Sequence, residues 1–237
     1  DGLLSGGRWT GGKITYSDPN TAADYPSGYV SDIDHDGFSA QRDGFSRLTA
    51  TQLKSVRAVL DADGGPAAQA GFTVEGFTNL SVRDAGSGSG AGDLRFARTS
   101  DTQTAYAYKP GPGIGGDVWL GQSGRSPVAG NYDHFTLLHE TGHALGLKHA
   151  HESTGFGKVA TAWDSVEFSV MSYRSFVGAS APSYKFEKAG APQSYMMLDI
   201  AALQHMYGAD FTTNSGDTTY SWRPNSGVTY VNGSAAI

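Results

Sequence analysis

The sequence has 237 residues, a formal net charge of −6 and no cysteine. A chain of this length can bury a substantial core as one large domain or two small ones. The lack of cysteine excludes disulfides, thiol catalysis and cysteine-ligated zinc, and 17 scattered basic residues against 23 acidic ones argue against nucleic acid as a partner. No apolar run reaches the about 18 residues that a membrane-spanning helix needs, so no membrane span is expected.

The first half of the chain contains several predicted strands and one predicted helix. A strand is expected near the start of the chain, over residues 8–16, after glycine-rich turns. Thr49 and Gln52 form a capping-box pattern, and a helix with one apolar face should follow it and end near Asp61. Glycine- and proline-rich turns separate four further predicted strands, at 72–75, 93–98, 105–108 and 117–120.

The second half contains two predicted helices and a long irregular stretch. One helix should begin at Asp133, as its N-cap, and run to about Leu145, where Gly146 can end it in a left-handed conformation. Residues 150–193 read mostly as loop, and a further helix is expected over 195–207. Early strands with helices between and after them indicate an α+β layered domain.

The segment HETGHALGLKH, which starts at His139, carries the strongest chemical signal. On a helix, His139 and His143 lie four residues apart, so both imidazoles can face one ion. Glu140 can reach a metal-bound water without binding the metal itself. After Gly146 the chain can turn sharply and bring His149 round as a third ligand. Three protein ligands leave one position open for water, which is typical of a catalytic zinc site rather than a structural one.

The zinc motif has alternatives, and the chain has histidines outside it. A zinc site without catalysis is the plainest alternative, but it would not need Glu140 beside the metal. His134 is expected on the same helix and off its metal-binding face, and His205 is expected to pack within a later helix. His151 could compete with His149 for the metal, although His149 alone has the expected spacing. No GxSxG segment supports a serine hydrolase.

A methionine downstream of the histidines makes a family resemblance visible. With Met171 in the segment SVMSY, the motif resembles the metzincin clan of zinc proteases, in which such a methionine lies in a tight turn beneath the metal. Within that clan the chain resembles the serralysins, which are secreted bacterial proteases. The segments that carry this resemblance span nearly the whole chain: DGLLSG, GGDVWL, SVMSY, MLDIAALQHMYGA and SGDTTY.

The resemblance implies a fold and a domain division. The fold would be a metzincin-like α+β domain with a twisted mixed sheet, an active-site helix and a mostly irregular C-terminal subdomain. The catalytic domain would cover 1–210, with an upper part of about 1–146 and a lower part of about 147–210. Residues 211–237 would begin a linker or a truncated C-terminal region.

The resemblance also assigns two roles outside the histidine motif. Tyr173 would bind zinc in the resting enzyme and then move to support the tetrahedral intermediate, since a phenol can act as an oxygen ligand and as a hydrogen-bond donor. A tyrosine that merely packs near the turn is the alternative. Residues 116–120 resemble the edge strand that pairs with an extended substrate, although an ordinary strand would have the same sequence.

The sequence therefore predicts a secreted zinc endopeptidase that cleaves extended protein or peptide substrates and is a monomer. Zinc would be bound by His139, His143, His149 and Tyr173, with Glu140 as general base and Tyr173 assisting the oxyanion. The first residues show no secretory signal, so such a signal has been removed or lies outside this chain. Two alternatives stay open: a catalytically silent zinc-containing module that binds peptides, and a metal-dependent hydrolase of other substrates.

Three features depart from the serralysin pattern. Ala150 stands where a proline usually follows the third histidine, and Arg174 stands where a tryptophan commonly follows the tyrosine. Both positions flank the site, so they are expected to alter specificity and leave the ligands intact. The calcium-binding repeats of serralysins do not occur in this sequence, although the 214–218 turn resembles the bridge toward them.

An acidic segment offers a separate calcium site. Asp32, Asp34 and Asp36 alternate along the chain, with Gly37 at the sixth position and Asp43 at the twelfth, as in a calcium-binding loop. The twelfth residue is aspartate rather than glutamate, and no helix clearly precedes the loop. Structural Ca²⁺ and a solvated acidic loop are therefore both retained as interpretations.

Overall fold

The structure is a computed structural model that describes residues 1–26, 29, 44–86, 88, 90–182, 184–223 and 226–237. Its helices are α1 (Ala50–Leu60), α2 (Val74–Phe77), α3 (Tyr132–Ala144) and α4 (Met197–Tyr207), with the 3-10 turns η1 (Ala22–Asp24), η2 (Ala67–Phe72) and η3 (Thr161–Trp163). Its strands are β1 (Lys13–Ser17), β2 (Ser81–Asp84), β3 (Leu94–Arg98), β4 (Ala105–Ala107), β5 (Asp117–Leu120), β6 (Tyr220–Trp222), β7 (Thr229–Val231) and β8 (Ser234–Ala235).

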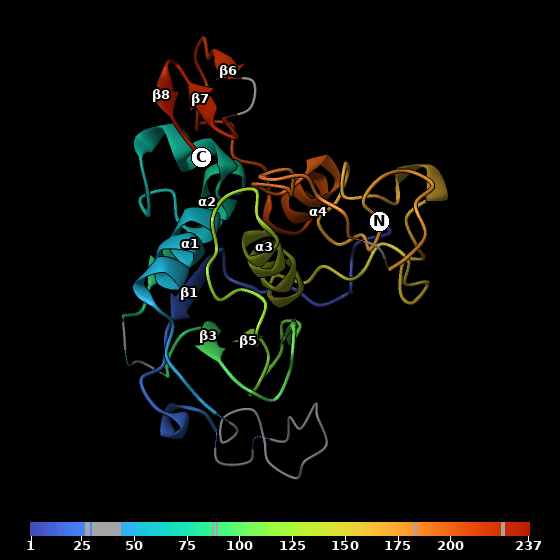
Figure 1. The fold of residues 1–237 in the computed structure, drawn as a ribbon. Helices are drawn as coiled ribbons and strands as arrows, with labels where there is room; N and C mark the ends of the chain where they lie inside the picture. The colour runs from blue at the N-terminus through green and yellow to red at the C-terminus, as the bar shows by residue number, and fades with distance from the viewer. Residues whose placement is uncertain (27–28, 30–43, 87, 89, 183, 224–225) are drawn as a thin grey trace.

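A five-stranded sheet in the order β2–β1–β3–β5–β4 forms the centre of the fold. β1 runs parallel to both β2 and β3, and β3 runs parallel to β5, whereas β4 is antiparallel to β5. Helices α1 and α3 contact each other and lie together on one side of the sheet (Figure 1). The sheet is mixed and the domain is α+β, as the sequence predicted.

The central strands are buried because both faces of the sheet are covered. Phe96 of β3 and Val118 of β5 face the main core that the helices complete. Ala97 and Trp119, one residue further along each strand, face the opposite side and pack with aromatic residues that include Tyr25. This explains why consecutive residues at the centre of each strand are apolar, Phe96–Ala97 in β3 and Val118–Trp119 in β5, as in parallel strands covered on both faces.

Most predicted elements are confirmed, and local chemistry explains their boundaries. The Thr49 hydroxyl accepts the Gln52 backbone N–H at 3.2 Å while the Gln52 side chain accepts the Thr49 N–H at 2.9 Å, so the predicted capping box starts α1. The predicted strands at 93–98, 105–108 and 117–120 correspond to β3, β4 and β5, and the last predicted helix corresponds to α4.

The start of α3 and the strand expected at 72–75 were predicted wrongly. The N-cap of α3 is Asn131, whose side chain accepts the backbone N–H of His134 at 2.8 Å, and Asp133 lies in the first turn instead. Phe72 ends η2 and Val74 begins α2, because the Thr73 hydroxyl between them accepts the Gly76 N–H at 3.0 Å and caps the helix. A hydroxyl that caps a helix outweighs the weak strand preference of so short a run. The strand β2, directly after α2, was not predicted.

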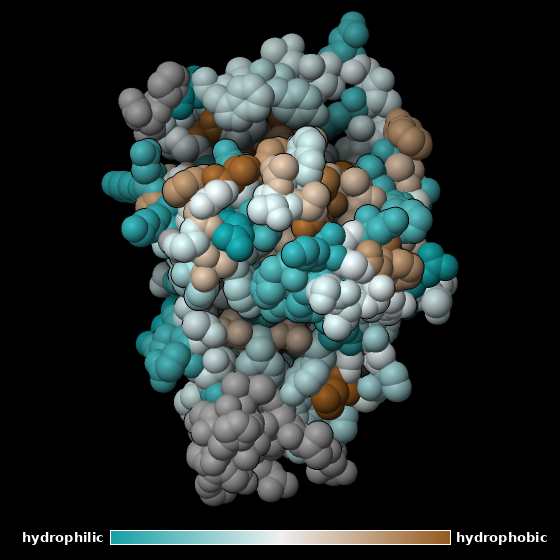
Figure 2. All heavy atoms as spheres, turned by 90° about the vertical axis from the view of Figure 1, so that its right-hand side faces the viewer, coloured by the Kyte–Doolittle hydropathy of each residue, from teal (hydrophilic) through white to brown (hydrophobic). Residues whose placement is uncertain are grey.

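Long irregular segments cover one side of the molecule. In residues 150–193, η3 is the helical element among the described residues, in agreement with the predicted loop. Figure 2 turns this side toward the viewer, and its coloured apolar residues form small separate groups among hydrophilic ones. None of the described helices is both long and apolar enough to traverse a lipid bilayer.

The C-terminal strands β6, β7 and β8 form a separate antiparallel sheet that contacts η2 near one end of the molecule (Figure 1). These strands lie within residues 211–237. The expected division into a catalytic domain over 1–210 and a following region stays a prediction.

Candidate metal centre and active site

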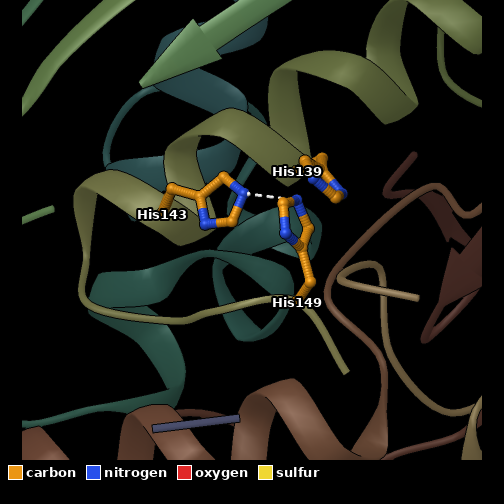
Figure 3. A group of neighbouring side chains, drawn as sticks. All are labelled: His139, His143 and His149. Carbon is orange, nitrogen blue, oxygen red and sulfur yellow. Dashed lines mark hydrogen bonds between the residues drawn. The ribbon is translucent and has the colours of Figure 1, made fainter. Parts of the chain in front are cut away.

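Three histidines converge at one point beside α3. His139 and His143 project from the helix and His149 approaches from the loop that follows it (Figure 3). The nitrogens through which they could bind an ion all lie within 4.8 Å of one another. Among the described residues, these three histidines are the cluster that could hold a metal ion. Nε2 of His143 lies 3.0 Å from Nε2 of His149.

A sharp turn after α3 brings the third histidine back to the helix. Gly146 has a φ of +107°, the left-handed region predicted for it, and a Cβ there would lie 2.4 Å from the Gly7 carbonyl oxygen. The returning chain pairs with the first residues of the protein: Leu4 and Leu147 form an antiparallel bridge, and the Lys148 N–H donates to the Leu3 carbonyl at 2.8 Å. Glycine is therefore required at this turn for both its φ and its close packing.

The Nδ1 atom of each histidine has an acceptor on the side away from the convergence point. For His139 the acceptor is the Val170 carbonyl at 2.7 Å, and for His143 it is the Leu147 carbonyl at 3.0 Å. For His149 the acceptor is a carboxylate oxygen of Glu152 at 2.5 Å. We infer that each Nδ1 carries the proton, which leaves each Nε2 with a free lone pair.

The donor set fits a zinc ion. Burial, reinforced by the neighbouring His149, lowers the pKa of His139 to about 4, and burial also holds the pKa of His143 well below its usual range. Both imidazoles are therefore neutral near pH 7. Two Nε2 lone pairs that face each other at 3.0 Å repel unless a cation lies between them, and nitrogens bound to one tetrahedral zinc at 2.0–2.1 Å would be roughly 3.4 Å apart.

Glu140 lies next to the histidines and is almost fully buried, with 7% of its surface exposed. It lines a cavity of about 210 Å³ together with Thr104, Ala105, Tyr173 and Tyr184, among other residues. Burial raises the pKa of this carboxyl to about 8. A cation bound nearby would favour the carboxylate and lower that pKa again.

Tyr173 also reaches the convergence point. Its hydroxyl lies 2.8 Å from Nε2 of His149, and its ring lies 5.8 Å from that of His139, stacked on it. Burial, with a further contribution from the charge of Glu140, raises the pKa of Tyr173 to about 12. The phenol therefore stays protonated near pH 7 and can donate a hydrogen bond.

The segment around Met171 lies directly against α3. Met171 is fully buried, and a Cβ added to Gly142 would lie 2.7 Å from its sulfur, so the glycine inside the histidine motif permits this contact. Asp199 of α4 accepts from the Ser169 hydroxyl at 2.6 Å and from the Val170 N–H at 2.8 Å. Because the Val170 carbonyl in turn supports His139, this buried carboxylate indirectly orients the histidine.

Sequence reasoning missed the role of Asp199. A local signal for it exists, because a carboxylate within the otherwise apolar run MMLDIAAL has to find partners if it is buried. Two of those partners, Ser169 and Val170, lie about 30 residues earlier in the chain, and the sequence does not indicate which segment supplies them.

The two residues that depart from the serralysin pattern both have structural partners. The Ala150 N–H donates to the Met171 carbonyl at 3.1 Å, a hydrogen bond that proline cannot make. The Arg174 guanidinium donates to Asp164 at 3.1 Å and also to the Ala179 carbonyl. Both residues thus tie the Met171 segment to neighbouring loops.

The prediction that residues 116–120 form an edge strand was wrong. Residues 116–120 contain β5, which pairs with β3 on one side and β4 on the other, so β5 is internal. Among the described strands, the outermost on this side is β4, which contacts α3 and begins beside Thr104 and Ala105 at the cavity. Strand order was not predictable here because β4 precedes β5 in the chain yet lies outside it.

The remaining histidines lie outside the metal-ligand group. His134 is buried with its Nε2 3.0 Å from the Gln193 carbonyl, as expected for a residue off the metal-binding face. The His151 ring stacks on that of His149 at 5.3 Å. His205 is exposed, so the prediction that it packs was wrong: it lies on the outer face of α4.

Two segments of the chain resemble parts of calcium sites. The acidic loop with Asp32, Asp34, Asp36 and Asp43 lies outside the described residues. In the 214–218 turn, the Thr218 hydroxyl lies 3.2 Å from the carbonyl oxygens of both Asn214 and Gly216. Calcium binding by the acidic loop stays a prediction.

Known proteases are similar to this chain. Serralysin B of Dickeya chrysanthemi is 30% identical over 223 residues, which make up 90% of this chain and 42% of that protein. Serralysin of Proteus mirabilis is 36% identical over 156 residues, covering 58% and 31% of the two chains. The metallopeptidase AprA of Pseudomonas marginalis is 32% identical over 187 residues, covering 69% and 38%. The chain thus spans less than half the length of these curated relatives, and no protein-family model matches it.

Proposed function

Because the chain is serralysin-like, we propose that it is a secreted zinc-dependent endopeptidase that cleaves extended protein or peptide substrates. The observation that carries the proposal is the convergence of three Nε2 atoms beside a buried glutamate and a protonated tyrosine. Secretion and protein substrates are proposed from the serralysin relatives. A monomer is proposed from the sequence.

His139, His143 and His149 would hold the metal, each through Nε2, with Nδ1 fixed by its acceptor. A zinc ion bound there would polarise the scissile carbonyl and make a water molecule acidic enough to lose its proton. Tyr173 would be a fourth, oxygen ligand at rest, which its 2.8 Å contact with Nε2 of His149 supports.

Two side chains would carry the proton and the developing charge. Glu140 would accept the proton of the attacking water and return it to the leaving amine. Burial raises its pKa and a nearby cation lowers it again, so the pKa would lie near the working pH, as a general base requires. The Tyr173 hydroxyl would donate a hydrogen bond to the oxyanion that forms on the substrate. Such a donor is most effective when it is protonated and partly buried, as Tyr173 is.

The outermost strand supports a peptide as the substrate. Among the described strands of the sheet, β4 is the outermost and lies beside the site, so an extended peptide could align along it. The adjoining cavity is lined by Tyr132, Phe135 and Tyr184, so it would receive a large apolar side chain of that peptide. A binding module that holds peptides without cleaving them would use the same strand and cavity.

The test is cleavage of casein by the purified chain, with and without 1,10-phenanthroline, followed by addition of zinc. Cleavage that the chelator abolishes and zinc restores is expected, and Glu140→Ala should bind zinc but cleave at least about 10²-fold more slowly. Asp63→Ala, an exposed carboxylate on the loop after α1, is the matched control and should cleave at the wild-type rate.

Two outcomes would count against this function. A wild-type chain that binds zinc and peptide but cleaves nothing would favour the binding module. A wild-type chain that binds no zinc would remove the basis of the proposal. A zinc-free Glu140→Ala variant would oppose the assignment of Glu140 as a base that does not bind the metal.

A further inference from the structure

Glu152 stands out among the groups that support the three histidines. His139 and His143 each donate to a backbone carbonyl, whereas His149 has a side-chain carboxylate as its acceptor, at 2.5 Å. His149 is also the histidine that does not lie on α3, so the helix does not fix its position. The least constrained of the three imidazoles therefore has the strongest acceptor.

Glu152 is itself held by a buried cation. Lys148 is 1% exposed, and its ammonium group donates to three backbone carbonyls: those of Glu152 at 2.6 Å, Gly2 at 2.6 Å and Gly157 at 2.7 Å. The Glu152 N–H also donates to the His149 carbonyl at 3.2 Å. The main chain of Glu152 is thus fixed by Lys148, while its side chain fixes His149.

A second cation faces the Glu152 carboxylate from the sheet. Lys109, in the segment after β4, has its Nζ 3.8 Å from the carboxylate oxygen that does not contact His149. The Glu152 side chain is 28% exposed, so this ion pair is partly screened and orients the carboxylate more than it stabilises the fold. The carboxylate consequently has one oxygen for His149 and one for Lys109.

We propose that Glu152 is a positioning residue that fixes the tautomer and orientation of His149 for metal binding, with Lys148 holding Glu152 in place. This inference rests on the proposed zinc site. A carboxylate acceptor keeps the proton on Nδ1, directs the Nε2 lone pair toward the metal and makes that nitrogen a stronger donor. Because the other two histidines donate to backbone carbonyls, Glu152 supports a ligand directly through a side chain that a substitution can change while the ligand itself is kept.

The test measures zinc affinity directly, by competition with a chromogenic chelator, in the wild type, Glu152→Gln and Glu152→Ala. Loss of such a supporting group typically weakens metal binding by about 10- to 100-fold, and Glu152→Ala is expected in that range. Glu152→Gln keeps an acceptor of the same shape without the charge, so an intermediate loss is expected. Asp63→Asn, an exposed acid on the loop after α1, is the matched control and should leave the affinity unchanged.

Two further readouts separate positioning from a purely structural role. The visible spectrum of the Co²⁺-substituted protein should change in Glu152→Gln, because the spectrum reports the ligand geometry. The thermal unfolding of the metal-free variants shows whether they are folded. Unchanged zinc affinity in Glu152→Ala, with or without a lower Tm of the metal-free protein, would overturn the inference and leave the proposed function standing. A wild type without measurable zinc affinity would instead overturn both.

Discussion

The hydroxyl of Tyr173 lies 2.8 Å from Nε2 of His149, and that same nitrogen lies 3.0 Å from Nε2 of His143. A phenol oxygen and two imidazole nitrogens thus approach one point from three directions. The tyrosine follows Met171 by two residues, in the segment whose Val170 carbonyl supports His139. The segment that supports the helix-borne ligand therefore also delivers the phenol.

Tyr173→Phe is expected to lower kcat by about 10²- to 10³-fold, because it removes a hydrogen-bond donor that would act on the oxyanion in the transition state. KM should change little, and zinc should stay bound through the three histidines although the phenol ligand is lost. Steady-state cleavage of a fluorogenic peptide, with zinc determined in parallel, measures all three. Tyr230→Phe, in β7, is the matched control. A kcat that equals the wild-type value would show that Tyr173 only packs near the site.

Glu140→Gln is expected to change the pH dependence of the stability of the metal-free protein. The pKa of Glu140 is raised from 4.5 to about 8 in the folded state, so between these values the folded chain binds more protons than the unfolded chain. The contribution of this group to the free energy of unfolding therefore falls as pH rises from about 5 to 8. The variant lacks this loss, and its stability relative to wild type should rise by on the order of a few kcal/mol over that range.

Urea unfolding at a series of pH values, in the presence of a chelator, measures this difference. Zinc-loaded protein provides the internal control, since a nearby cation stabilises the carboxylate and should flatten the trend. A difference between wild type and Glu140→Gln that does not vary with pH would contradict the burial argument.

Asp199→Asn should destabilise the protein and loosen the metal site. The carboxylate accepts three hydrogen bonds, from Ser169, Val170 and Met196, and an amide has only one acceptor oxygen and would turn a donor toward another donor. A loss of about 2–4 kcal/mol in the free energy of unfolding is expected. Zinc affinity should fall as well, since Val170 supports His139.

Denaturant unfolding of the metal-free protein and chelator competition measure the two effects of this substitution. Asp133→Asn is the matched control: it alters a carboxylate that accepts the Ser126 N–H on the surface, and a change below about 1 kcal/mol is expected. If both variants behaved alike, Asp199 would have no special role in supporting the Met171 segment.

Ala150→Pro would restore the residue usual in serralysins, yet it should destabilise this chain. Proline has no N–H, so the Met171 carbonyl would lose the donor that now lies 3.1 Å away. A cost of about 1–3 kcal/mol is expected, and thermal unfolding measures it. Ala150→Gly retains the N–H and serves as the comparison. A more stable proline variant would show that this hydrogen bond is dispensable.

Local patterns in the sequence were sufficient for much of the site. The spacing of His139 and His143 on a helix, and a glycine suited to the turn before His149, depend only on neighbouring residues, and the structure brings all three together. The capping box at Thr49 is local in the same sense. Features of this kind depend on a few neighbouring residues, so the sequence alone predicts them.

Features that depend on distant partners could not be predicted. The edge position of β4 follows from its pairing with a strand that comes later in the chain, which no local pattern encodes. Asp199 appears in the sequence as an ordinary acidic residue, and its role follows from a contact with Val170 that the fold creates. Glu152 lies only three residues after His149, but outside a helix that spacing does not indicate that the two side chains meet. The helical turn at Thr73 was missed for a different reason: a side-chain cap competed with strand preference over very few residues.

The antiparallel bridge between Leu4 and Leu147 has a consequence for how the protein folds. Helix α3 can bring two imidazoles together through short-range contacts alone, whereas the third depends on a pairing between segments far apart in the sequence. Contacts between such distant segments form slowly, because the entropy cost of closing a long loop comes before the contacts stabilise the chain. We infer that tight metal capture follows this closure, so that Leu4→Ala would slow zinc uptake in stopped-flow refolding, and uptake at the wild-type rate would refute this. The metal would then act as a latch that locks a finished topology, not as a nucleus around which the chain assembles.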